Sequence, residues 1–235
     1  MLSFLGSLVR LRIEGGRFVR EVKEQHVLPV DGRYAVVGPD PLRVLLFGGD
    51  YATGTNVRTR QDALDGAVAE VLHAQTGRGV IVENRSYPEV PLDRLVASLG
   101  ASGAHTFDLV IWCPTFSEGV RRPRGASWRT ALNRTIRFLR STSDAGILLL
   151  GIPDLLGTQP LAQLARSRAR ALNGAIARVA AEHEDVLVVT PPPVDADMVA
   201  ELDGRETYRR AAATMAPALE QLLAARPRVA LTPRP

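Results

Sequence analysis

Five short apolar runs, each followed by a longer stretch of helical pattern, constrain the fold of this chain more than any other feature. The runs occupy residues 44–47, 80–84, 108–113, 146–151 and 186–190. They are continuous in apolar character and rich in Val, Ile and Leu, which is typical of strands buried on both faces. Their alternation with helices predicts an α/β fold with a mainly parallel five-stranded sheet and a ligand site beyond the carboxyl ends of the strands.

Helical patterns fill the intervals between these runs. We expect helices at residues 62–75, 92–99, 127–140 and 161–183, and a last one at 205–224. In two of them the apolar side chains fall on one stripe, which predicts the face turned to the core. The stripes are Trp128, Leu132, Ile136 and Leu139 in one helix, and Leu161, Leu164, Leu172, Ile176 and Val179 in the other.

The length of 235 residues and the 46% hydrophobic content suit one sizeable core. We therefore divide the chain into an amphipathic N-terminal helical segment at residues 1–30, a single domain at 40–225 and a tail at 226–235. The tail holds three prolines and shows no helical period. No repeat or linker marks a second domain.

The charged residues, the cysteine and the histidines indicate which partners, compartment and metals to expect. The net charge is +4, yet Lys23 is the only lysine, most arginines are interspersed with acids and 5% of residues are aromatic, so we expect no nucleic-acid partner. Cys113 stands alone in an apolar run, which predicts a buried thiol, a reducing compartment and a cytoplasmic location. The four histidines are scattered, so we expect no metal. The glycines at 48, 49 and 54 lack the G-x-G-x-x-G spacing and no P-loop lysine follows, so we expect no cofactor. His73 and His183, within or at the end of predicted helices, are expected to be solvated or to cap those helices.

The first 25 residues could form an amphipathic helix. Their apolar residues include Leu2, Leu5, Leu8, Val9 and Ile13, with Arg10, Arg12, Arg17 and Arg20 interleaved. The apolar part is too short for a membrane span and unlike a secretory signal. Two interpretations stay open. The helix packs across the domain, which we favour, or residues 1–25 attach the protein peripherally to a membrane surface or a protein partner.

The stretch at residues 43–58, RVLLFGGDYATGTNVR, reads as a buried strand that ends in a tight loop. It resembles the first block of the SGNH (GDSL) hydrolase family, in which a strand ends in Gly-Asp-Ser and the serine is the nucleophile. Gly49, Asp50 and Gly54 are retained, whereas Tyr51 stands at the serine position. The resemblance covers roughly residues 40–225 and implies a flavodoxin-like three-layer α/β/α sandwich.

The later blocks of the family can be placed by spacing. The resemblance implies oxyanion-like positions at Ser86, where the family has a glycine, and at Ser117, where it has an asparagine. The final Asp-x-x-His block matches Asp203 and Glu206, so a glutamate replaces the histidine that serves as the base. The chain therefore resembles a degenerate member that lacks both the catalytic serine and the catalytic histidine.

Loss of the nucleophile and the base together removes the family's reaction path. Our leading hypothesis is a non-hydrolytic binding or scaffold pseudoenzyme with a small acyl, ester-like or glycosyl-like ligand, or a partner's loop, at the old pocket. The predicted pocket, beyond the degenerate positions themselves, consists of Asp50, Thr53, Gly54, Tyr87 and Phe116. Tyr51 and Tyr87 could equally fill that pocket and leave a scaffold only.

Two further classes stay open. One is an active esterase, lipase or acyltransferase with a rearranged site, in which Tyr51 or Thr53 attacks and Glu206 or Asp203 is the base. A carboxylate is a feeble base for a hydroxyl unless burial raises its pKa, which weakens this hypothesis. The other class is a regulatory or assembly subunit that docks through the N-terminal segment.

Overall fold

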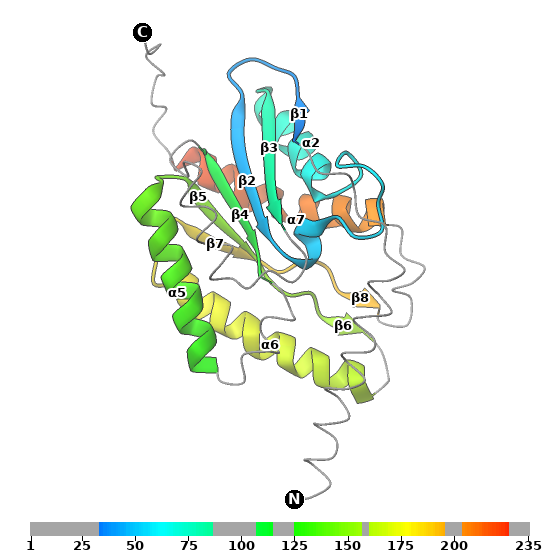
Figure 1. Cartoon of the computed structure of the whole chain (residues 1–235), viewed down its shortest axis with the longest axis vertical. Helices are drawn as coiled ribbons and strands as arrows, with labels where there is room; N and C mark the ends of the chain where they lie inside the picture. The colour runs from blue at the N-terminus through cyan, green and yellow to red at the C-terminus, as the bar shows by residue number, and fades with distance from the viewer. Residues whose placement is uncertain (1–32, 87–106, 115–124, 157–159, 196–203, 226–235) are drawn as a thin grey trace, which may run out of the picture.

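The computed structural model of the chain describes residues 33–86, 107–114, 125–156, 160–195 and 204–225. A six-stranded sheet runs through the centre in the order β1-β3-β2-β4-β5-β7 (Figure 1). Its strands are β1 (Tyr34–Val36), β2 (Leu42–Gly48), β3 (Val80–Ser86), β4 (Leu109–Cys113), β5 (Gly146–Leu150) and β7 (Val186–Val189). Two short strands, β6 (Leu155–Leu156) and β8 (Val194–Asp195), pair with each other beside it.

The five parallel strands follow the predicted flavodoxin-like order, with β2 first in sequence and second in space. The α/β class and the mainly parallel sheet are therefore confirmed. The sixth strand, β1, was not predicted, and it pairs antiparallel to β3 with Tyr34 opposite Val82. Its three residues are too few to form a recognisable apolar run, and the middle one is exposed at the edge of the sheet.

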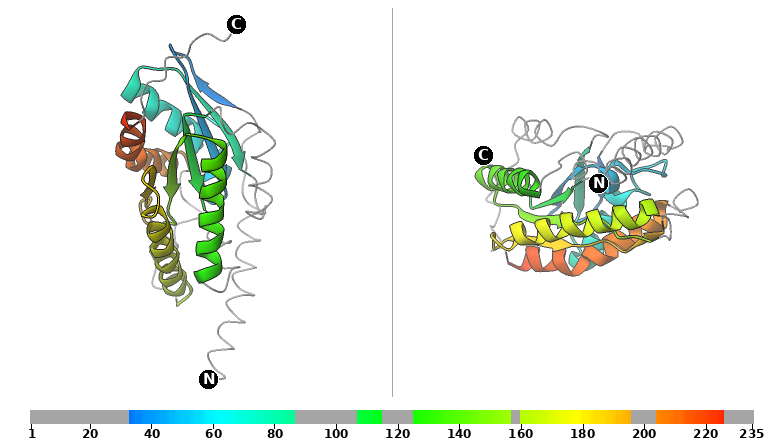
Figure 2. Two further views of the ribbon diagram at one scale, coloured as in Figure 1. Left: turned by 90° about the vertical axis from the view of Figure 1, so that its left-hand side faces the viewer. Right: turned by 90° about the horizontal axis from the view of Figure 1, so that it is seen from below.

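Within the described ranges, four α-helices cover the sheet and complete three layers. They are α2 (Leu64–Thr76), α5 (Gly125–Thr142), α6 (Pro160–Ala180) and α7 (Gly204–Ala224). In Figure 1 the strands pass in front of α2 and α7, and seen from below in Figure 2, α6 and α7 lie in separate layers. The expected helix at 92–99, the N-terminal segment and the tail lie outside the described residues.

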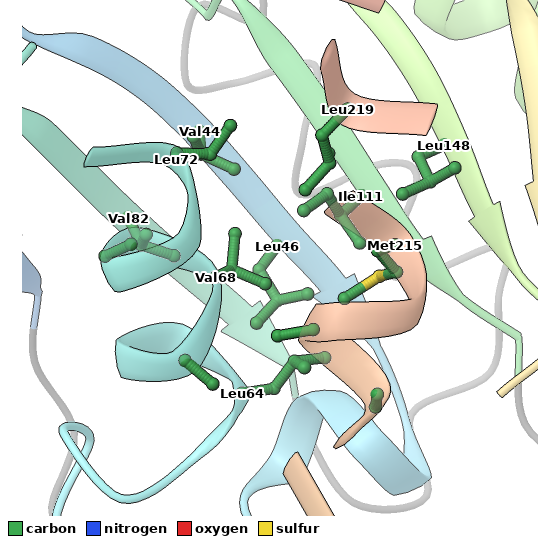
Figure 3. Packing of buried hydrophobic residues seen from close by; sticks show 14 of the residues in the cluster. Val44, Leu46, Leu64, Val68, Leu72, Val82, Ile111, Leu148, Met215 and Leu219 are labelled. Atoms are coloured by element: carbon green, nitrogen blue, oxygen red, sulfur yellow. The ribbon is translucent and has the colours of Figure 1, made fainter. Parts of the chain in front are cut away.

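The sheet separates two hydrophobic cores, because successive side chains of a strand point to opposite faces. On β2, Val44 and Leu46 pack with α2 and α7, whereas Leu45 and Phe47 pack with α5 and α6. Figure 3 shows the first core, in which side chains from α2 and α7 meet those of the central strands. The central strand is thus buried on both faces, as its continuous apolar run predicts.

The predicted helix faces are confirmed where the structure describes their side chains. All four residues of the first stripe, from Trp128 to Leu139, are buried, as are Leu172, Ile176 and Val179 of the second. The side chains of Leu161 and Leu164 lie outside the described residues. Cys113 is also buried, as expected from its apolar surroundings.

The helix ends differ slightly from the prediction, for local reasons. α2 starts at Leu64 instead of residue 62, because Asp62 belongs to a preceding turn in which its N–H and carboxylate both bond the Thr59 hydroxyl. α2 ends at the left-handed Gly77, beside which a ring nitrogen of His73 lies 2.7 Å from the Arg78 carbonyl oxygen. The His73 ring thus contacts a residue beyond the helix, and the cap of α2 is the main-chain hydrogen bond from the Gly77 N–H to the His73 carbonyl oxygen.

Candidate functional site

The carboxyl ends of three adjacent strands meet at one level. In the parallel register, Gly48 at the end of β2 lies opposite Ser86 on β3 and Cys113 on β4. A short 3₁₀ helix, η1 (Asp50–Thr53), follows immediately and carries the position at which the resemblance places the nucleophile. Tyr51 and Ser86 are thereby brought to the same edge of the sheet, where α/β proteins bind their ligands.

The backbone at Gly48 approaches β4 so closely that no side chain fits. Gly48 has a φ of +123°, and a Cβ added there would lie 2.1 Å from the carbonyl oxygen of Cys113. The next residue, Gly49, donates its N–H to that same oxygen at 3.0 Å. The start of the loop is therefore fixed by main-chain contacts, for which glycine is required.

Tyr51 is half-buried and packs against α7. Its ring meets the ring of Tyr208 edge to face, with 6.0 Å between centroids and 81° between planes. Tyr208 is buried, and its hydroxyl donates a hydrogen bond to the Thr55 carbonyl oxygen at 2.8 Å. Tyr208 could not be predicted from the sequence, since nothing in a helical pattern marks which aromatic residue will meet a loop far away in the chain.

The N–H of Ser86, the expected oxyanion donor, already has an acceptor. It donates to the side-chain oxygen Oδ1 of Asn84 at 2.8 Å. The amide nitrogen of Asn84 in turn donates to the Ala52 carbonyl oxygen and to Asp65 Oδ1, both at 2.8 Å. Asn84 thus connects β3 to η1 and α2. The hydroxyl of Ser86 is buried and has no hydrogen-bond partner within the described part of the chain.

A buried carboxylate lies behind this asparagine. Asp65, in the first turn of α2, is fully buried, and its Oδ2 lies 3.6 Å from Nη1 of Arg60. Burial raises the pKa of Asp65, while the hydrogen bond from Asn84 and the charge of Arg60 act in the opposite direction. Asn84, Asp65 and Arg60 form what we call the support network. The support network could not be predicted from the sequence, because Asn84 and Asp65 belong to separate elements and Arg60 to the turn before α2.

The other predicted residues of the η1 loop are turned inward. Thr53 is 8% exposed, and its hydroxyl oxygen lies 3.0 Å from that of Thr55. Gly54 adopts the left-handed conformation that ends η1, with a φ of 74°. Thr53 is therefore held within the loop instead of facing open solvent, which makes it a poorly accessible nucleophile.

Glu206 lies in the first turn of α7 and pairs with a neighbour on the same helix. Its Oε1 accepts a hydrogen bond from Nε of Arg210 at 2.8 Å, and the side chain is 50% exposed. Residues two apart on a helix are turned by about 200° from each other. Glu206 and Tyr208 therefore face different sides of α7, and the described contact between Tyr51 and α7 goes through Tyr208.

Several predicted site residues fall in parts of the chain that the structure does not describe. The side chain of Asp50 and the whole of Tyr87, Phe116, Ser117 and Asp203 lie outside the described residues. The structure therefore brings together Tyr51, Thr53, Gly54 and Ser86 at one edge. It adds Tyr208 and the support network to them.

The described residues show neither a metal centre nor a membrane span. No group of three or more His, Cys, Asp or Glu side chains in that part of the chain is arranged to hold a metal ion. Among its helices none combines the length and the apolar character needed to cross a membrane. A surface groove of about 490 Å³ lies along α5, and its lining includes none of the predicted site residues.

Comparison with solved structures identifies the fold. No protein-family model matches the chain, and no curated protein matches it in sequence. The crystal structure of TesA is similar at a TM-score of 0.58 and 20% identity, covering 77% of this chain and 99% of TesA. The lipase/acylhydrolase from Enterococcus faecalis is similar at 0.55 and 16%, covering 77% and 96%.

A family two carbohydrate esterase from Cellvibrio japonicus is similar at a TM-score of 0.59 and 14% identity, with 80% of this chain covered. This chain spans 63% of the length of that esterase. At identities this low the likeness shows the fold alone. That fold is the one found in SGNH (GDSL) hydrolases, as the resemblance implied.

Proposed function

We propose that this chain is a non-hydrolytic pseudoenzyme on the SGNH-hydrolase fold, which binds a small acyl or ester-like ligand at the carboxyl ends of β2, β3 and β4. The observation that carries the proposal is the contact between Tyr51 and Tyr208. A serine nucleophile attacks when a base removes its proton beside a preformed oxyanion hole. A phenol ring packed against a buried aromatic ring supplies neither the reach nor the orientation of that serine.

The state of Ser86 supports the same proposal. Oxyanion stabilisation requires N–H donors aimed at the point where negative charge develops. The Ser86 N–H is instead bonded to Asn84, whose other hydrogen bonds tie it to η1 and α2. Freeing this donor would require a change in the support network, so the site lacks an available donor at this position.

The competing hypothesis is an active ester hydrolase or acyltransferase. The esterase and the acylhydrolase with similar folds favour it, since the shared architecture can carry that chemistry. Tyr51 would then be the nucleophile, with Glu206 or Asp203 as the base. The pairing of Glu206 with Arg210, on a different side of α7 from Tyr208, weighs against Glu206 in this role.

Ester hydrolysis separates the two hypotheses. Pure protein is assayed on short-chain and medium-chain p-nitrophenyl esters, beside Tyr51→Ala as the matched control. We expect the wild type to turn over no faster than Tyr51→Ala. Turnover in the wild type that Tyr51→Ala abolishes would overturn the proposal and establish a tyrosine-centred mechanism.

Ligand binding is tested on the same proteins. A ligand that binds only the folded state raises the melting temperature, by an amount that grows with its concentration. We expect the same esters to raise the melting temperature of the wild type. An unchanged melting temperature, together with no ester turnover by a Tyr51→Ser, Glu206→His double variant, would instead indicate a scaffold with a filled pocket. Turnover gained by that double variant would show that the pocket persists.

The cytoplasmic location and the role of residues 1–25 stay predictions. If this segment docks on a membrane surface or a protein partner, replacing Leu5 and Leu8 by glutamate should abolish the association and leave the domain folded. If it packs across the domain, the same change should lower the melting temperature instead.

A further inference from the structure

The two helical layers of the sandwich differ sharply in charge. α2 and α7 carry three arginines and four acidic residues, Asp65, Glu70, Glu206 and Glu220. α5 and α6 carry eight arginines and no aspartate or glutamate. The two layers pack on opposite faces of the sheet, so the eight arginines of α5 and α6 belong to one layer of the sandwich. We call the outer side of α5 and α6 the basic face.

A groove concentrates this charge beside α5. It has a volume of about 490 Å³ and is lined by Arg129, Thr130, Asn133, Arg134, Arg137 and Glu182. Residues 130, 133, 134 and 137 follow the spacing of one helical stripe, so they present a continuous surface. Glu182, the acidic member of the lining, already accepts a hydrogen bond from Asn133 at 3.3 Å.

The arginines of the groove are not neutralised by described acids. Elsewhere on the basic face, Arg140 pairs with Asp185 at 3.2 Å and Arg170 pairs with Asp154 at 3.1 Å. Within the described ranges, no ion pair joins Arg129, Arg134 or Arg137 to an acidic residue, and all three are exposed. Unneutralised surface charge of one sign raises the local concentration of a polyanion.

We propose that the basic face docks on an anionic membrane surface, with the groove arginines against the lipid headgroups. Guanidinium groups bind phosphate and carboxylate oxygens in a two-pronged geometry, and basic residues next to a membrane add to one another in attraction. Stable peripheral attachment needs two signals. The predicted amphipathic segment at residues 1–25, in which Leu8, Val9 and Ile13 are followed by or alternate with arginines, supplies a sequence in keeping with the second.

The same observations favour lipid over nucleic acid. In the N-terminal sequence Val9 and Ile13 alternate with Arg10 and Arg12, a composition that suits the boundary between headgroups and acyl chains and gains nothing on a phosphate backbone. The groove lining contains no aromatic residue on which a base could stack. The basic face shares no residue with the site at the strand ends, so membrane docking does not depend on the proposed function.

Vesicle sedimentation with the full chain tests the proposal. Vesicles of phosphatidylcholine alone are compared with vesicles in which phosphatidylserine replaces part of it. The test variant is Arg129→Gln, Arg134→Gln, Arg137→Gln. The matched control is Arg205→Gln, Arg209→Gln, Arg210→Gln on α7, which removes the same charge from the opposite layer. We expect wild type to bind the anionic vesicles, and the groove variant to bind about ten- to a hundredfold more weakly.

The control should keep its affinity within about threefold of wild type, and added salt should weaken wild-type binding. Equal losses in both variants, or no binding by wild type, would overturn the proposal. Tighter binding to duplex DNA than to the anionic vesicles, with the same dependence on the groove, would show a nucleic-acid surface instead. Melting temperatures check that each variant is folded. If the groove variant is not, Arg134→Glu alone should still weaken vesicle binding about fivefold or more.

Discussion

The rings of Tyr51 and Tyr208 meet edge to face. This contact joins η1, which follows β2, to the helix α7. Tyr208 is held on both sides, since its hydroxyl is bonded to the Thr55 carbonyl oxygen. The side chain at the old nucleophile position has therefore become part of the packing between η1 and α7. Its role can be measured as stability.

Tyr208→Phe keeps the ring contact and removes only the hydroxyl. We expect it to lower the free energy of unfolding by about 1–2 kcal/mol, because the Thr55 carbonyl loses its donor. Tyr208→Ala should cost about 3–5 kcal/mol, since it also leaves a cavity beside Tyr51. Urea unfolding measures both, followed by the fluorescence of the buried Trp112 and Trp128. Equal costs would mean that the ring contact contributes nothing.

Asn84→Ala should destabilise the protein by about 2–4 kcal/mol, because its hydrogen bonds to η1 and α2 are lost together with a third one within β3. Asn133→Ala is the matched control, since Asn133 makes its contacts with Glu182 and His183 nearer the surface. We expect the control to cost less than about 1 kcal/mol. Similar costs at the two sites would show that the support network is no stronger than an ordinary surface contact.

Asp65 gives the stability an unusual dependence on pH. Burial raises its pKa in the folded state above the usual 3.8, so just above pH 3.8 the unfolded chain releases a proton that the folded chain retains. Stability contributed by Asp65 therefore falls as pH rises through the interval between these two pKa values.

The check is the difference in unfolding free energy between wild type and Asp65→Asn, measured from pH 3 to pH 7 by urea denaturation. Because asparagine does not titrate, the variant should gain relative to wild type as the pH rises. A relative gain by wild type would mean that attraction to Arg60 outweighs the burial of the carboxylate.

Gly48→Ala should cost about 4 kcal/mol or more, because the new methyl group would collide with the Cys113 carbonyl and the φ of +123° excludes other residues. Gly77→Ala provides the comparison. It also has a positive φ, of 65°, but a Cβ there meets nothing within 4 Å, so it should cost about 1–2 kcal/mol. Comparable melting temperatures for the two variants would contradict the close approach of β2 and β4.

The parts of the fold that depend on local pattern could be predicted from the sequence. Residues 44–47 read as a strand because every side chain there is apolar, and the structure buries all four. The stripe from Trp128 to Leu139 likewise identified the inner face of α5. In both cases the information lies within a few residues, and burial on the observed side is the only way to remove those side chains from water.

The site depends on pairs that are distant in the chain, and these could not be predicted. Asn84 reaches Asp65 and Ala52, which belong to α2 and η1. No motif announces such a contact, since an asparagine at the end of a strand is equally compatible with an exposed loop. The assignment of Ser86 by spacing placed the residue at the right edge of the sheet but could not foresee that its N–H was already bonded.

The close approach at Gly48 has a consequence for how such chains diverge. The carboxyl ends of β2 and β4 are held together by backbone atoms, through the Gly49 N–H and the Cys113 carbonyl. The approach of these two strands therefore does not depend on the side chain of residue 51, which lies beyond it in η1. Over evolutionary time a lineage can exchange the side chain there, and with it the reaction, while natural selection for a foldable chain continues to preserve the strands beneath.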